Sequence, residues 1–110
     1  MSAPIGSCEF LVRARVEFPA ELPADERAVL QAAEHERGCE LARAGTIRGI
    51  WRIPGAVANV AVWRAADATE LHELLMALPL AAHITFEVTA LAVHPIARSV
   101  GLPDDARSAG

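Results

Sequence analysis

The sequence predicts an α+β fold in which two helices cover one face of an antiparallel sheet. Segments of two-residue period alternate along the 110-residue chain with segments of helical period, and that length suits one domain. Between two apolar arms, Pro54 and Gly55 provide the fixed φ and the positive φ that a type II turn needs at its central positions. Arg48 to Arg64 is therefore expected to form a hairpin on which the other elements pack.

The first half of the chain predicts a strand and then a helix. Apolar residues at every second position predict a strand over Cys8 to Phe18 with one buried face. The segment from Ala24 to Ala44 is dominated by residues of high helix propensity, and Gly45 suits the position just after a helix. Residues 1–7 are mostly small and are expected to form a flexible N-terminus.

The second half predicts another helix and a last strand. Asp67 and Glu70 have the spacing of a capping box, and the leucines that follow recur at helical spacing until Pro79. Alternation resumes over Ile84 to Val93. The order β-α-β-β-α-β is the ferredoxin-like arrangement.

Two helices leave the other face of this sheet to be covered by something else. The domain spans residues 8–95, and the apolar share of the chain, 53%, is slightly above that of ordinary soluble domains. We therefore expect a sheet-packed dimer or higher homo-oligomer, with residues 96–110 as a C-terminal arm.

Composition and motifs exclude several classes of function. The net charge is −4 and the basic residues are scattered, so nucleic acid is not an expected partner. Cys8 and Cys39 form no CxxC pair, and the four His residues lack metal-ligand spacing, so we expect no metal. The sequence has neither a P-loop nor a GxGxxG motif, so a nucleotide cofactor is not expected, and we expect no other cofactor. The sequence shows no export signal and no membrane span, which favours a cytoplasmic location without membrane contact.

Glu34 is the strongest candidate for a catalytic group. On a helical wheel it lies beside Leu30, on the stripe of Ala33, Arg37 and Leu41 that should pack against the sheet. A carboxyl group buried against apolar residues becomes a usable general base. Two alternatives stay open, an ion pair with Arg37 and a surface glutamate without a function.

Five further residues are candidates for the same site. Arg52 in the hairpin needs either an anionic ligand or a carboxylate partner, and its neighbour Trp51 is assigned with it to substrate binding. Arg13 on the first strand either has a ligand or a carboxylate partner, as Arg52 does, or is exposed to solvent. Asn59 can hydrogen-bond a ligand carbonyl or the local backbone. His83 directly precedes the last strand, and loops are frequent places for functional residues.

Longer motifs make the chain resemble muconolactone Δ-isomerase, a small cofactor-free enzyme family of the β-ketoadipate pathway. The matching segments include FLVR at 10–13, IWRIPG at 50–55, ELHELL at 70–75, EVT at 87–89 and HP at 94–95. The resemblance implies a ferredoxin-like subunit of a homo-oligomer, with pockets shared between subunits, that moves a ring double bond by proton transfer on an unsaturated lactone. It also implies that Glu34 is the proton shuttle and that Arg13 and Arg52 hold the substrate carboxylate or the enolate.

Three departures from the family's motifs bear on the substrate. Gly49 stands where the family usually has His, Val57 where it has Tyr, and the segment 80–84 replaces a Leu-Phe-Pro-Tyr-Met stretch. His83 occupies the lost Tyr position and is a candidate for an acid or hydrogen-bonding role. A pocket lined by Gly49, Val57 and the two alanines before His83 would be wider and more apolar. We therefore expect a larger or less polar substrate than muconolactone, in a biosynthetic pathway.

Other functions stay open on the same scaffold. Abstraction of an acidic C–H proton can also lead to ring closure or halide loss, so a cyclase or dehalogenase acting on a polyketide-like substrate is one alternative. A non-catalytic, small-molecule-binding oligomer is another, suggested by the lost His and Tyr. A cofactor-free monooxygenase is conceivable, although no residue of the sequence points to it.

Overall fold

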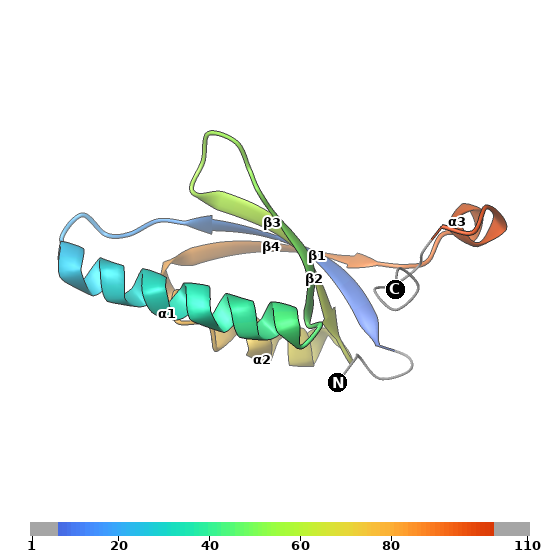
Figure 1. Ribbon diagram of the computed structural model, residues 1–110, viewed down its shortest axis with the longest axis horizontal. Coiled ribbons are helices and arrows are strands. Elements are labelled where there is room, and N and C mark those ends of the chain that lie inside the picture. Colours follow the sequence, from blue (N-terminus) through green and yellow to red (C-terminus); the bar gives the residue numbers. More distant parts are fainter. Residues whose placement is uncertain (1–6, 103–110) are drawn as a thin grey trace.

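The computed structural model describes residues 7–102 and contains the predicted β-α-β-β-α-β order (Figure 1). The elements are β1 (Cys8–Val16), α1 (Ala24–Arg43), β2 (Ile47–Arg52), β3 (Ala58–Ala65), α2 (Ala68–Met76), the 3₁₀ turn η1 (Ala81–His83), β4 (Ile84–Leu91) and α3 (Pro95–Ser99). The sheet is antiparallel with the strand order β2-β3-β1-β4, and α1 and α2 lie together on one side of it. The predicted fold class is confirmed.

The turn between β2 and β3 forms as its residues predict. Gly55 has φ of 79°, and the Ala56 N–H donates to the carbonyl of Ile53 at 3.3 Å to close the turn. The carbonyl of Val57 then accepts a hydrogen bond from the Val16 N–H at 3.0 Å. This bond ties the end of the hairpin to the end of β1.

Local signals also fix the helix ends. Gly45, just after α1, has φ of 83°, a conformation that glycine adopts without strain. At the start of α2, the Glu70 N–H donates to Oδ1 of Asp67 at 2.8 Å, and Oε1 of Glu70 accepts from the Ala66 N–H at 2.7 Å. The predicted bounds of α1 and the predicted start of α2 are right to within one residue. The end of α2 is not, because α2 ends at Met76 although its helical spacing was expected to continue until Pro79. β1 and β4 each end two residues before the expected position.

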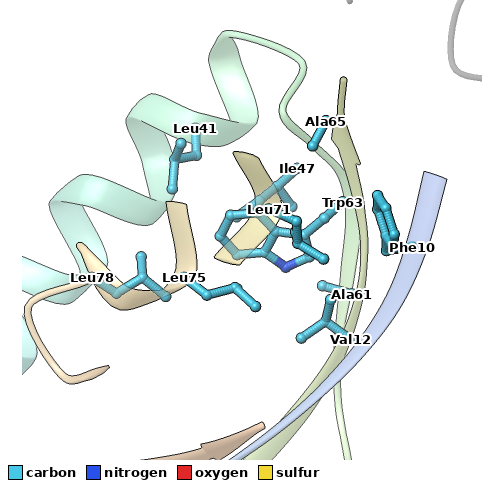
Figure 2. Packing of buried hydrophobic residues seen from close by; sticks show 10 residues of the cluster. All are labelled: Phe10, Val12, Leu41, Ile47, Ala61, Trp63, Ala65, Leu71, Leu75 and Leu78. Atoms are coloured by element: carbon cyan, nitrogen blue, oxygen red, sulfur yellow. The ribbon is translucent and has the colours of Figure 1, made fainter. Parts of the chain in front are cut away.

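The hydrophobic core lies between the sheet and the two helices. Figure 2 shows the indole of Trp63 from β3 surrounded by side chains of the other elements, among them Phe10, Val12, Leu71 and Leu75. Phe10 and Trp63 are direct cross-strand partners, so two aromatic side chains stand side by side on the covered face. Leu41, Ile47, Ala61, Ala65 and Leu78 complete this core.

The predicted stripe of α1 is partly wrong. Leu41 is buried and Glu34 is half-buried, but Ala33 is exposed. Arg27 is half-buried instead. On a helix Ala33 and Arg27 lie about 60° from Leu30 in opposite directions, and the sheet lies on the Arg27 side.

The chain beyond β4 leaves the body of the domain. In Figure 1, α3 stands apart from the sheet and from both long helices. The large apolar residues in and next to α3 are exposed, namely Val93, Ile96, Val100 and Leu102. Most of the predicted flexible N-terminus and the end of the predicted arm lie outside the described residues.

Candidate active site

One row of side chains crosses all four strands on the helix-covered side. Arg52 pairs with Asn59, Asn59 with Ala14, and Ala14 with Phe86. Directly paired residues project to the same face of a sheet, and Ala14 is buried beneath the helices. Arg52 and Asn59 are therefore on the same side of the sheet as Glu34.

The adjacent row projects to the opposite face. Trp51 pairs with Val60, and Val60 pairs with Arg13. The indole of Trp51 is 58% exposed and lies over Gly49, where an added Cβ would come 2.7 Å from Cη2 of the indole. The sheet thus separates Arg13, Trp51 and Gly49 from Glu34, and Gly49 does not line a pocket with the alanines before His83.

A stack of three side chains closes the end of β1. The Glu17 N–H donates to the carbonyl of His83 at 2.9 Å, which brings η1 to this end of the sheet. The ring of Phe18 lies 5.4 Å from the imidazole of His83, centroid to centroid, at an angle of 48°. The guanidinium of Arg27 lies 5.2 Å from the centroid of the same Phe18 ring.

Glu34 is joined to the segment that carries His83. The Leu80 N–H donates to Oε1 of Glu34 at 2.9 Å, and the His83 N–H donates to the carbonyl of Leu80 at 2.8 Å. A carboxylate can accept several hydrogen bonds, so Glu34 keeps acceptor capacity for a substrate proton. Arg37 is not its partner, because Nη1 of Arg37 lies 3.2 Å from Oε1 of Glu40.

The cations on this side differ in their surroundings. Arg52 is exposed, and residues 7–102 offer it no ion-pair partner. Arg27 is half-buried, and its Nε is shielded from solvent without a hydrogen-bond acceptor. Sequence reasoning missed Arg27, although its place two helical turns before Glu34 puts both side chains on one side of α1.

A second charged cluster lies on the opposite face of the sheet. Oε2 of Glu9 is 3.6 Å from Nη2 of Arg64 and 3.7 Å from Nε of Arg48. The side chain of Arg64 is only 2% exposed. This cluster holds two guanidinium groups against one carboxylate and shares no residue with the Glu34 side.

A hollow of about 370 Å³ lies along α1 and is lined by Asp25, Glu26, Val29 and Leu30, none of them a candidate residue. Within residues 7–102, no three His, Cys, Asp or Glu side chains are grouped as metal ligands. None of the helices in that part of the chain is long and apolar enough to cross a bilayer.

Comparisons with known proteins give a consistent result. Residues 8–97 match the family described as muconolactone delta-isomerase. The muconolactone Delta-isomerase of Acinetobacter baylyi is 37% identical over 86 residues, 78% of this chain and 90% of that protein. The enzyme of the same name from Pseudomonas putida is 35% identical over 86 residues, again 78% of this chain and 90% of that protein. A crystal structure of muconolactone isomerase superposes with a TM-score of 0.75 at 37% identity, covering 79% of this chain and 91% of that chain. The chain belongs to the muconolactone delta-isomerase family.

Proposed function

We propose that this protein is a cofactor-independent isomerase that moves a ring double bond in an unsaturated lactone, either muconolactone or a larger related compound. Family membership supports the reaction type. The observation that carries the site is Glu34, whose carboxylate is held by the Leu80 N–H at 2.9 Å on the helix-covered side of the sheet. A base fixed in this way keeps its position through both proton transfers.

Proton transfer by one carboxylate accounts for the whole reaction. Glu34 removes the proton from the carbon that bears the ring oxygen, and the electron pair moves through the ring double bond onto the lactone carbonyl oxygen. The carboxylic acid then returns a proton to the carbon next to that carbonyl, and the double bond forms at its new position. Atoms and electrons balance without a redox step or a leaving group.

The dienolate needs a stabiliser for its oxygen. Arg52 and Asn59 are neighbours in the cross-strand row, and together they offer a cation and an amide N–H on the Glu34 side. We assign them to the lactone oxygen, and His83 to a hydrogen-bonding or acid role beside Glu34. Arg13 and Trp51 project from the other face, so we assign them to a contact between subunits.

We infer that another subunit completes the pocket. The row next to Arg52 and Asn59 begins at Ile50 and ends at Val88, and these residues are 53% and 46% exposed although they project to the helix-covered side. The two helices therefore leave both edges of that side open. A homo-oligomer with shared pockets would cover them, and the free thiols of Cys8 and Cys39 suit a cytoplasmic enzyme.

Purified protein and muconolactone in D₂O, followed by NMR, test the proposal. We expect the ring double bond to move with deuterium incorporation beside the carbonyl, and Glu34→Gln to lower turnover by about 100- to 10,000-fold. Glu36→Gln is the matched control, because Glu36 is an exposed residue of the same helix. Absence of turnover by the wild-type protein on muconolactone and on larger lactones, or an active Glu34→Gln variant, would refute the proposal. Turnover of muconolactone at ~10 s⁻¹ would refute only the expectation that the substrate is larger than muconolactone.

A further inference from the structure

We propose that Arg27 binds a carboxylate group of the substrate and that the ring of Phe18 holds the guanidinium in place for this role. The inference rests on the proposed function, because it identifies the acidic arm of a lactone such as muconolactone as the ligand of Arg27. It replaces the expectation that Arg13 serves this purpose, since the sheet lies between Arg13 and Glu34.

The geometry around Phe18 suits an anion-binding arginine. The guanidinium carbon of Arg27 is 5.2 Å from the ring centroid, a cation–π distance. A guanidinium that rests on an aromatic ring keeps the N–H groups along its edge available for a bidentate contact with a carboxylate. Phe18 also contacts His83, at 5.4 Å between ring centroids, and this second contact restricts the ring.

The hydrogen bonding of Arg27 is incomplete. Its Nε is shielded from solvent and has no acceptor, and none of the ion pairs within residues 7–102 includes Arg27. A buried donor without a partner is costly, and a charged donor more so. The terminal nitrogens of Arg27 are not among these shielded atoms, so a substrate carboxylate can bond to them and place a counter-charge beside the unpaired Nε. Arg52 is exposed to water, which already solvates its charge.

In this proposal the substrate has to reach both Arg27 and Glu34. The two residues lie on the same side of α1, about 10 Å apart along the helix axis. We therefore expect one substrate molecule to reach both residues, with its acidic arm on Arg27 and its ring toward the carboxylate of Glu34.

Turnover of muconolactone and of its methyl ester by Arg27→Met tests the role of charge. Met retains an apolar stem over Phe18 and removes only the cation. For the acid we expect KM to rise about 10- to 100-fold with kcat little changed. For the ester we expect wild-type and variant values of KM to agree. Arg27→Lys should restore part of the preference for the acid. Arg43→Met, at an exposed position of the same helix, is the control and should leave the KM of both substrates unchanged.

Calorimetric binding of the saturated lactone acid, which has no double bond to move, separates this inference from the proposed function. If the wild-type protein turns over muconolactone but Arg27→Met affects acid and ester alike, the role of Arg27 is refuted and the isomerase stands. If neither muconolactone nor a larger lactone is turned over but the saturated acid binds about 10- to 100-fold more weakly to Arg27→Met, the isomerase is refuted and the role of Arg27 stands. Should Arg27→Met fail to fold, Arg27→Gln, which also removes the charge, takes its place, and unchanged binding of the saturated acid to that variant overturns the inference.

Discussion

Replacement of Glu34 should have two effects that different substitutions can separate. In Glu34→Ala, the Leu80 N–H loses the acceptor that now lies at 2.9 Å, and Leu80 is only 5% exposed. An unsatisfied buried donor costs about 1–3 kcal/mol. In a domain of this size, each kcal/mol lowers Tm by about 4–8 °C, so the melting temperature of Glu34→Ala should fall by about 5–20 °C.

Glu34→Gln should behave differently, because the amide oxygen of Gln can accept the same hydrogen bond. Only the contribution of the charge is lost, which we expect to cost at most about 1 kcal/mol. Thermal unfolding followed by circular dichroism at equal protein concentration measures both variants, with Glu36→Ala as the control on the exposed side of α1. Both Glu34 variants should lose turnover. If Glu34→Gln melts as early as Glu34→Ala, or if neither melts earlier than the wild-type protein, the anchoring role of this hydrogen bond is refuted.

Two further predictions concern stability. Asp67→Ala removes the cap of α2 and should cost about 1 kcal/mol in urea unfolding, whereas Thr69→Ala, within the same helix, should cost much less; equal losses would contradict the capping role. Glu9→Ala leaves the buried guanidinium of Arg64 beside Arg48 without a counter-charge and should lower the free energy of unfolding by about 1–3 kcal/mol. This loss is smaller than that for a fully buried ion pair, because the side chain of Glu9 is 15% exposed. Arg64→Met leaves Glu9 paired with Arg48 and should be nearly neutral, so a larger loss for Arg64→Met than for Glu9→Ala would argue against this account.

Local signals explain why the fold could be predicted from the sequence. The turn at Pro54 and Gly55, the capping box at Asp67 and the glycine after α1 each act within a few residues, and each forms as expected. The rotation of α1 could not be derived in the same way. Ala33 and Arg27 are equally close to Leu30 on a helical wheel, and only long-range packing decides which of them faces the sheet.

The candidate site shows the same division between local and long-range information. Trp51 and Arg52 are consecutive residues of one strand, so only one of them can project toward Glu34, and this separation follows from the sequence. The contacts of Phe18 with Arg27 and His83 could not be predicted from the sequence, because these residues come from three separate segments. No periodic pattern in the sequence connects them.

The two tryptophans give this protein its own pair of optical reporters. The chain contains no tyrosine, so its fluorescence under selective excitation comes from these two indoles alone. Trp63 is 5% exposed in the core, whereas Trp51 is 58% exposed on the opposite face of the same sheet. A water-soluble quencher should therefore reach Trp51 first, and the Trp51→Phe variant should retain an emission that is blue-shifted and largely protected. Association through that face would be seen as protection of Trp51 while Trp63 stays unchanged, and loss of the core as a red shift of Trp63.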